Sequence, residues 1–275
     1  MCLLLIAVDH APGHRLVLLG NRDEFRARPS TAAAPWPDAP RILGGRDLVA
    51  GGSWLAIDGD GRYAAVTNLR NGLPATAPRS RGQLVAGFLH GARSPAAYLA
   101  ALRTEMDAYG PFNLIVGDAH GAWLLSSGST QIHHLERGIH VVSNGPYGTR
   151  WPKTERLGRA FTEQADDPGA QGDRWLALLA DDAQPADAEL PDTGVGLALE
   201  RQLAPILVRG ERYGTRASTL ARIDAAGRPA LSEQIWSAEG AAAPRHWRYE
   251  DEGYWKAVDD AAADEARRRP MREEE

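Results

Sequence analysis

The only cysteine of the chain stands at position 2, directly after the initiator methionine. The initiator is normally removed when residue 2 is small, so the mature chain would begin with a thiol and a free α-amine on Cys2. The ordinary pKa of an α-amine is about 7.7–8.0. The amine can therefore accept the thiol proton, directly or through a water, and the thiolate can attack a carbonyl. The alternative interpretation is a small buried residue at the start of a strand.

A polar run, Asn21-Arg22-Asp23-Glu24, follows the second predicted strand. Asp23 could hold and orient the N-terminal ammonium. Arg22 could bind a substrate carboxylate or pair with Glu24. The alternative interpretation is a solvated turn with a surface ion pair, which contributes little to stability.

Three further polar residues stand at ends of predicted strands. Asn68 ends one strand and Asn144 follows another, and an asparagine amide there can donate to a developing oxyanion. Arg216 begins a late strand, where its positive charge could lower the pKa of the cysteine. Taken singly, each is as well explained by a turn or a salt bridge.

Several classes of site are not supported by the sequence. The eight histidines have no metal-ligand spacing, and one cysteine excludes a cysteine-rich zinc site and an intrachain disulfide. Gly44-Gly45 and Gly51-Gly52 lack the pattern of a P-loop or a dinucleotide fingerprint, so we interpret them as loops that let backbone approach the site closely. We expect no bound metal.

Charge and hydropathy limit the classes of partner and the cellular compartment that the sequence supports. The formal net charge of -5 and the pI of about 5.9 disfavour nucleic acid as a partner. The apolar start, Leu3–Val8, runs into Asp9, which is too short for a signal peptide, and no run approaches the roughly 20 apolar residues of a membrane span. We therefore expect a cytoplasmic protein.

The elements that must position these residues alternate between strand hairpins and helices. The predicted strands are Leu3–Val8, Arg15–Leu19, Ser53–Ile57, Tyr63–Thr67, Asn113–Gly117, Ala122–Ser126, Gln131–Leu135, Ile139–Ser143, Ala217–Ile223 and Ala230–Trp236. The predicted helices are Ser80–His90, a segment that begins at Ser94-Pro95, Lys153–Gln164 and Asp173–Ala180. This order favours an α+β fold in which helices flank two antiparallel sheets. We expect one domain over residues 1–258 and a charged tail, helical or disordered, over 259–275.

Taken together, the motifs resemble the NRDE family, which is also called the transport and Golgi organisation protein 2 family. They occur in the order Met1-Cys2, Asn21-Arg22-Asp23-Glu24, Gly44-Gly45-Arg46-Asp47, Gly51-Gly52-Ser53-Trp54-Leu55, Thr67-Asn68, Ser80-Arg81-Gly82, Ser143-Asn144-Gly145-Pro146 and Tyr213-Gly214-Thr215-Arg216. The match spans about residues 1–237. It implies the N-terminal-nucleophile hydrolase fold, a four-layer αββα sandwich.

A wider resemblance, to the choloylglycine and penicillin V acylases of that fold, implies roles for individual residues. The positions that match are Cys2, Asp23, Asn68, Asn144 and Arg216, for which the resemblance implies catalytic roles. Apart from this resemblance, we expect substrate-binding roles for Asn21, Arg22, Glu24 and Trp54. The acylases carry an arginine before their Asn-x-Asp core. This chain has Leu19-Gly20 there and places its arginine inside the core.

Three functions remain open at this point. The first is an amidohydrolase in which Cys2 attacks a non-peptide amide after removal of Met1, with no cofactor required. The second is a non-enzymatic carrier of haem or of an acyl lipid or acyl-CoA, because the resemblance implies haem trafficking and lipid homeostasis. The third is an interaction protein on a relict fold. The oligomeric state does not follow from the sequence.

Overall fold

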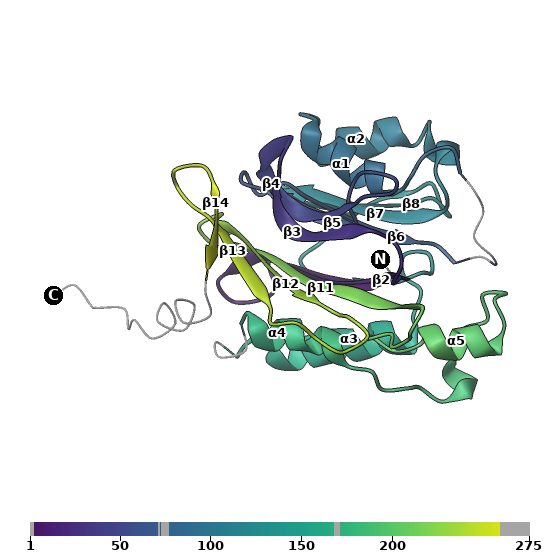
Figure 1. Ribbon diagram of the computed structural model, residues 1–275. Helices are drawn as coiled ribbons and strands as arrows, with labels where there is room; N and C mark the ends of the chain where they lie inside the picture. Colours follow the sequence, from purple (N-terminus) through teal and green to yellow (C-terminus); the bar gives the residue numbers. More distant parts are fainter. Residues whose placement is uncertain (1–2, 71, 73–76, 168–170, 259–275) are drawn as a thin grey trace.

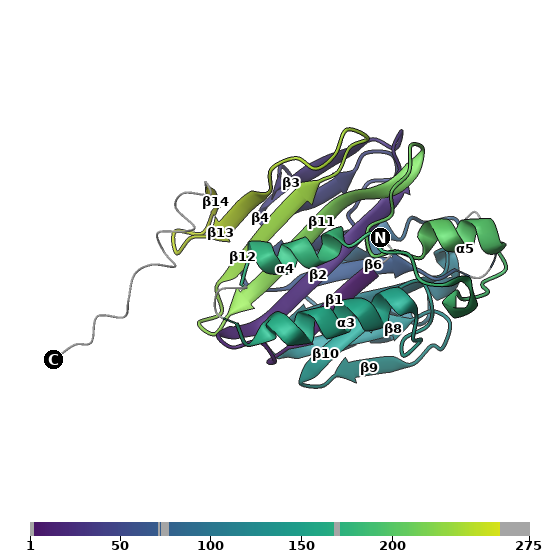
Figure 2. The same ribbon diagram turned by 90° about the horizontal axis from the view of Figure 1, so that it is seen from below.

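Two antiparallel sheets lie face to face between two layers of helices (Figures 1 and 2). The computed structural model describes residues 3–70, 72, 77–167 and 171–258. The four-layer αββα arrangement that the resemblance implied is therefore confirmed. Cys2 and the predicted tail, 259–275, lie outside the described residues.

Each sheet has seven strands. Sheet A consists, in spatial order, of β10 (Gly138–Val142), β1 (Leu3–Val8), β2 (His14–Phe25), β11 (Tyr213–Asp224), β12 (Pro229–Ile235), β13 (Arg245–Tyr249) and β14 (Trp255–Val258). Sheet B consists of β3 (Ser30–Trp36), β4 (Ala39–Asp47), β5 (Leu55–Asp58), β6 (Tyr63–Asn68), β7 (Phe112–Asp118), β8 (Gly121–Ser126) and β9 (Ile132–Leu135).

The helices cover the outer face of each sheet, α1 and α2 on sheet B and α3 and α4 on sheet A (Figures 1 and 2). Their bounds are α1 (Gly82–His90), α2 (Pro95–Leu102), α3 (Pro152–Ala165), α4 (Asp173–Ala177) and α5 (Leu197–Leu203). Single turns of 3-10 helix are η1 (Met106–Ala108), η3 (Leu178–Ala180) and η4 (Asp187–Glu189).

The continuous apolar run of β1 follows from its place in the second of four layers. All six of its residues are buried. Leu3 and Leu5 pack with the helices outside sheet A, whereas Leu4 and Ile6 pack between the two sheets. A strand covered on both faces needs apolar residues at every position, which explains why no alternation of polar and apolar residues is seen.

Gly44 and Gly45, predicted as a loop, lie within β4, so that prediction was wrong. A Cβ atom on Gly45 would lie 2.2 Å from the Trp54 ring. Glycine at this position makes room for that ring. The expected close approach at Gly44-Gly45 is therefore present, but it occurs in a strand.

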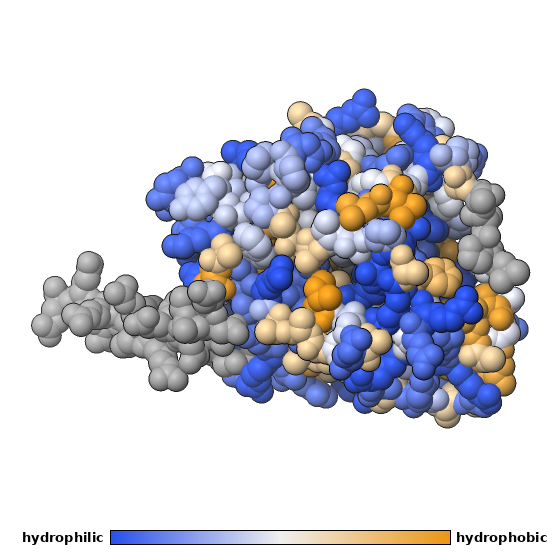
Figure 3. Space-filling model, viewed as in Figure 1, coloured by the Kyte–Doolittle hydropathy of each residue, from blue (hydrophilic) through white to orange (hydrophobic). Residues whose placement is uncertain are grey.

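Figure 3 presents a mainly hydrophilic face on which apolar side chains form separate patches. Large exposed apolar side chains include Phe25, Leu48 and Val49. Within the described part of the chain, no helix is both long and apolar enough to cross a bilayer.

Candidate functional site

The start of β1 lies between two of the predicted polar motifs. Leu3 pairs with Asn21 of β2 on one side, and Leu4 pairs with Val142 of β10 on the other. Asn144 follows two residues after Val142 in the sequence. Because β1 runs antiparallel to both neighbours, its first residues lie at the same end of the sheet as the polar run of β2 and the segment after β10.

The run Asn21-Arg22-Asp23-Glu24 lies inside β2 rather than after it, and its first three residues are buried. The solvated-turn interpretation is therefore wrong. Strand β11 extends the sheet beside this run, with Ser218 opposite Asn21 and Thr215 opposite Asp23. Neighbouring strands and layers replace water as the hydrogen-bond partners of these side chains.

Asn21 faces the helix layer and is fully engaged there. Its Nδ2 donates to the carbonyls of Leu179 and Ile206 at 2.9 and 2.8 Å. Its Oδ1 accepts a hydrogen bond from Ser218 Oγ at 2.6 Å. Both amide hydrogens are used, so the structure does not direct this side chain toward a ligand.

Asp23 is buried on the same face, held by a neutral partner. Thr215 Oγ1 donates to Asp23 Oδ1 at 2.6 Å and itself accepts from the backbone N–H of Val208 at 2.9 Å. Within the described residues, no lysine, arginine or histidine side chain forms an ion pair with Asp23. A buried carboxylate without a cationic partner destabilises the fold. A positive charge supplied by another group would stabilise Asp23 in this position.

Arg22 points the other way, into the space between the sheets, and is 3% exposed. Its Nη2 lies 3.2 Å from Asp47 Oδ2 and 4.0 Å from Glu24 Oε2, and its Cζ lies 4.4 Å from the centre of the Trp54 ring. Burial lowers the pKa of Arg22, and the charges of Glu24 and Asp47 oppose that shift. This guanidinium therefore joins the two sheets through Asp47 and Trp54.

Asp47, which was not singled out in the sequence, is the centre of this inter-sheet ion network. It accepts hydrogen bonds from Arg28 Nε at 2.6 Å and Nη2 at 3.1 Å, and from the backbone N–H groups of Val49 and Ala50. Burial favours the neutral acid, but these bonds outweigh it and hold the pKa of Asp47 below its ordinary value. Asp47 is the last residue of the motif Gly44-Gly45-Arg46-Asp47. The carboxylate in that motif was therefore the sequence feature that could have predicted this ion network.

Arg216 belongs to the same network. It sits at a register shift between Thr215 and Ala217, within β11 rather than at its start. Its Nη1 donates to the carbonyls of Arg28 and Phe25. Burial lowers the pKa of Arg216, and the charge of Glu24 opposes this. The predicted arginine is thus near Glu24, toward the end of β2.

Asn68, at the end of β6 in sheet B, lies against Asn144, in the segment that follows β10 of sheet A. Asn144 Nδ2 donates to the backbone carbonyl of Asn68 at 2.9 Å. Asn144 is buried, whereas Asn68 is partly exposed at the end of β6. Within the described residues, the Asn68 side chain makes no hydrogen bond. Its amide therefore remains available to an acceptor beside the start of β1.

A third asparagine, Asn113 on β7, fastens the two sheets here. Its Nδ2 lies within 2.9 to 3.1 Å of Gly145 O, Ser143 O and Thr67 Oγ1. Thr67 Oγ1 also donates to Ser143 O at 2.8 Å. Sequence reasoning placed Asn113 only at the start of a strand, because nothing local distinguishes a buried asparagine from an exposed one.

Arg70 clamps Asn144 from the other side. Its Nη2 donates to Asn144 Oδ1 at 3.1 Å, and its backbone N–H donates to Asn144 O at 2.7 Å. Its Nη1 forms an ion pair with Glu200 of α5 at 2.7 Å, and both side chains are largely buried. This contact fixes which end of the Asn144 amide is the donor, because the oxygen is occupied by the guanidinium.

Comparisons with known proteins match this chain to one protein family. A family model described as "Transport and Golgi organisation 2" matches residues 1–238. The mouse protein named "Transport and Golgi organization 2 homolog" is 32% identical over 259 residues, covering 85% of this chain and 92% of that protein. The human homolog is 32% identical over 255 residues with the same coverage.

A comparison with solved structures gives a match of low similarity. It is the Caenorhabditis elegans N-acylethanolamine-hydrolyzing acid amidase ortholog, which matches with a TM-score of 0.45 and 12% sequence identity over 80% of this chain and 92% of that chain. Among the described residues, no group of three or more histidine, cysteine or acidic side chains could hold a metal ion.

Proposed function

The chain belongs to the Transport and Golgi organisation 2 family, and from this premise we propose that it is an N-terminal-cysteine amidohydrolase that cleaves a non-peptide amide. The observation that carries the proposal is Asp23. Its carboxylate is buried without a cationic partner among the described residues, on the strand that pairs with the start of β1. A peptide bond joins Cys2 to Leu3, so the ammonium of a mature Cys2 is suited to supply the missing charge.

The reaction would begin with proton transfer from the Cys2 thiol to its own α-amine. Asp23 stabilises the ammonium that this transfer creates, and Thr215 fixes the carboxylate through the 2.6 Å hydrogen bond. The thiolate adds to the amide carbon, and the carbonyl electrons move onto oxygen. Nucleophile and base are then one residue, and Asp23 is the group that orients the base.

Two asparagines are suited to bind the oxyanion. Asn144 has one amide hydrogen engaged with Asn68 O, which leaves the other for a ligand, and the Asn68 amide is likewise available. Donors that are held before the reaction need no reorganisation as charge develops. The Asn113 and Arg70 contacts supply that rigidity.

Collapse of the tetrahedral intermediate completes the acylation half of the reaction cycle. The ammonium of Cys2 returns its proton to the leaving nitrogen, an amine departs, and a thioester remains. Water then adds to the thioester while the α-amine takes its proton. The carboxylic acid leaves and the thiol is restored, so the cycle needs no metal, oxidant or cofactor.

The alternative prediction, a carrier of haem or acyl lipid, would need an apolar cavity. A cavity of about 370 Å³ in this molecule is lined mainly by arginine, histidine and acidic side chains, with few apolar ones, which does not favour such a cargo. No observation on the described residues singles out haem.

The experiment is a hydrolysis screen of a library of N-acyl amides with wild type, Cys2→Ala and Cys2→Ser. Intact mass first establishes whether Met1 has been removed. We expect release of a primary amine by wild type, loss of release in Cys2→Ala, and a slow residual rate in Cys2→Ser. The proposal fails if processed wild type and Cys2→Ala are equally inactive, or if Met1 is retained. Haem titration of both proteins, followed by the Soret band, tests the carrier.

A further inference from the structure

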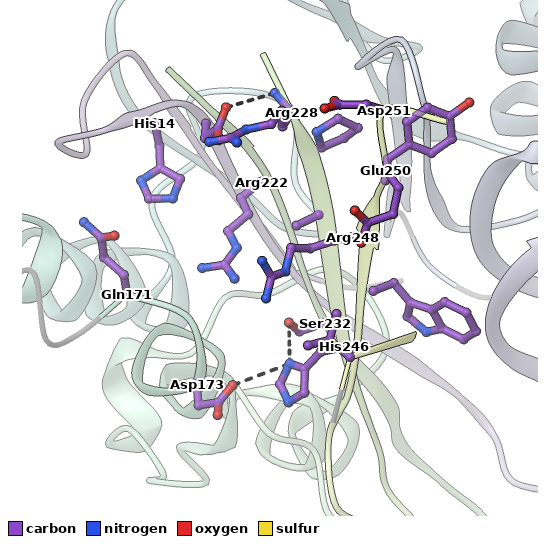
Figure 4. A pocket seen from close by; sticks show the side chains of 16 residues that line it. His14, Gln171, Asp173, Arg222, Arg228, Ser232, His246, Arg248, Glu250 and Asp251 are labelled. Carbon is purple, nitrogen blue, oxygen red and sulfur yellow. Dashed lines mark hydrogen bonds and ion pairs between the residues drawn. The ribbon is translucent and has the colours of Figure 1, made fainter. Parts of the chain in front are cut away.

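A cavity of about 370 Å³ lies on the helix-side face of sheet A, at the edge of the sheet beyond α4 (Figure 4). Its floor consists of residues of β11, β12 and β13, and Asp173 of α4 forms one wall. Small-molecule sites in proteins have volumes of about 300–1,000 Å³. His14, at the beginning of β2, also lines the cavity. The polar run of the proposed catalytic site lies seven positions further along β2, about 23 Å away, so the two sites are separate.

The floor carries an in-register row of basic residues. Arg222 of β11 pairs with Ala230 of β12, Ala230 pairs with Arg248 of β13, and Arg248 pairs with Lys256 of β14. Directly paired residues on neighbouring strands point to the same face. The two arginines therefore stand on either side of the small Ala230 side chain, two strand spacings or about 10 Å apart at the backbone.

Figure 4 shows the guanidinium groups of Arg222 and Arg248 side by side above this floor, with Arg248 directed away from Glu250. Arg248 makes no hydrogen bond or ion pair within the described residues. The third arginine of the cavity, Arg228, is paired with Asp224 at 2.8 Å. Arg222 and Arg248 are on the same face of the two strands that neighbour β12, so both guanidinium groups can donate hydrogen bonds to one anion above Ala230.

Most of the remaining lining is polar or charged, including the carboxylates of Asp173, Asp224, Glu250 and Asp251, whereas Pro229, Trp247 and Val258 are apolar. Burial is the main cause of the lowered pKa of His14, and the positive charge of Arg222 adds to it. At the opposite end, Ser232 Oγ lies 2.9 Å and Asp173 Oδ1 3.8 Å from the same nitrogen, His246 Nδ1. A Ser–His–Asp triad requires the serine and the acid on different ring nitrogens, so this group is not a catalytic triad.

We propose that this cavity is a second site, which binds a small oxyanion-bearing molecule with its phosphate or carboxylate group between Arg222 and Arg248 above Ala230. Guanidinium forks bind both groups through charge-assisted pairs of hydrogen bonds. The Ala230 side chain leaves room for the anion, and the polar far wall suits the uncharged hydroxyl groups of the same molecule.

Isothermal titration of full-length protein at low ionic strength tests this, with glycerol 3-phosphate and succinate as the two probes. We expect at least one probe to bind with a Kd below about 1 mM, and the preferred probe to identify phosphate or carboxylate. Arg248→Gln and Arg222→Gln should each weaken binding about tenfold. Cys2→Ala should leave binding unchanged, which separates this site from the proposed catalytic one.

Arg245→Gln is the matched control, because Arg245 is an exposed residue of the same strand that points to the opposite face. It should change Kd less than about twofold. A second variant, Ala230→Glu, places a carboxylate between the arginines; it should raise Tm and abolish probe binding. The proposal is overturned if neither probe binds wild type, if Arg245→Gln weakens binding as much as Arg248→Gln, or if Ala230→Glu lowers Tm and still binds the probe.

Discussion

The amide nitrogen of Asn144 lies 2.9 Å from the backbone carbonyl of Asn68, which joins the segment after β10 to the end of β6, 76 positions away. This bond fixes the rotation of the Asn144 amide, because Arg70 occupies the oxygen on its other side. One amide hydrogen remains for a ligand. The pair is therefore an oriented donor site at the edge where β1 begins.

The first prediction concerns Asn144. If its free hydrogen stabilises the oxyanion, Asn144→Ala should lower the kcat of Cys2-dependent amide hydrolysis by roughly 10²–10³-fold. The alkylation rate of Cys2 by iodoacetamide should stay within about twofold of wild type, since the donor acts on the transition state and not on the thiol. Equal losses in alkylation and in kcat would mean that the substitution disturbs the nucleophile instead.

The second prediction is a pH dependence of stability from Glu233, which is fully buried between the sheets. Burial raises its pKa to about 7 from an ordinary 4.5, against the backbone N–H of Ala33 and the charges of Arg245 and Arg22. The fold therefore favours the protonated acid. The folded protein holds this proton more tightly than the unfolded chain does. The resulting contribution to the free energy of unfolding is complete below about pH 4.5 and is lost as the pH rises through about 7, by up to roughly 3 kcal/mol.

Urea unfolding at pH 5, 6, 7 and 8 measures this loss. Glu233→Gln keeps the shape and cannot ionise, so its free energy of unfolding should fall less between pH 5 and 8 than that of wild type. Glu211→Gln removes an exposed carboxylate and should leave the wild-type slope intact. A Glu233→Gln protein with an unchanged slope would show that other groups cause the pH dependence.

The sequence predicted the elements whose patterns are local. The β1–β2 and β5–β6 hairpins and the four consecutive strands β7 to β10 have clear turns between apolar runs, and Ser94 caps α2 as expected, accepting from the N–H of Ala97. The four-layer order came from the family resemblance. The signals for the hairpins and for the helix cap lie within a few residues, which is why they can be recognised without knowledge of the fold.

The missed features depend on distant partners. Strands β3, β4, β13 and β14 lack a clear apolar run because each contains Pro, Gly or charged residues, and their strand conformation depends on pairing with neighbours. Asp47 and Arg70 acquire importance only through contacts with Arg28, Arg22 and Glu200, which are 19, 25 and 130 positions away. The sequence predicted the family's motif residues but not the side chains that hold them.

The third prediction tests the packing under Arg22. A Cβ on Gly45 would meet the Trp54 ring at 2.2 Å, so Gly45→Ala must move the ring over which Arg22 lies. We expect a loss of about 1–3 kcal/mol in the free energy of unfolding. Gly158 of α3 is the control, since its Cβ would meet Val141 only at 3.4 Å. Gly158→Ala should be neutral or stabilising by up to about 1 kcal/mol. Equal effects of the two substitutions would contradict this account.

The last prediction concerns the buried ion pair between Arg70 and Glu200, which are separated by 2.7 Å and attach α5 to the segment after β6. Arg70→Met leaves the Glu200 carboxylate buried without its cation and should cost roughly 3–5 kcal/mol. The backbone N–H and the hydroxyl of Thr193 still donate to Glu200 Oε1, so the helix keeps these two hydrogen bonds. The double variant Arg70→Met/Glu200→Leu should recover much of the loss, because no charge is then buried.

An exposed pair with nearly the same geometry provides the control. Arg79 Nη1 and Glu105 Oε2 are 2.8 Å apart, with side chains 49% and 60% exposed. Arg79→Met should cost less than about 1 kcal/mol, since water screens that pair. Arg70→Met should also lower kcat, because the Asn144 amide loses the contact that fixes its oxygen, and the double variant should recover stability without recovering kcat. If stability and kcat return together, the ion pair holds only the fold, and Arg70 does not orient Asn144.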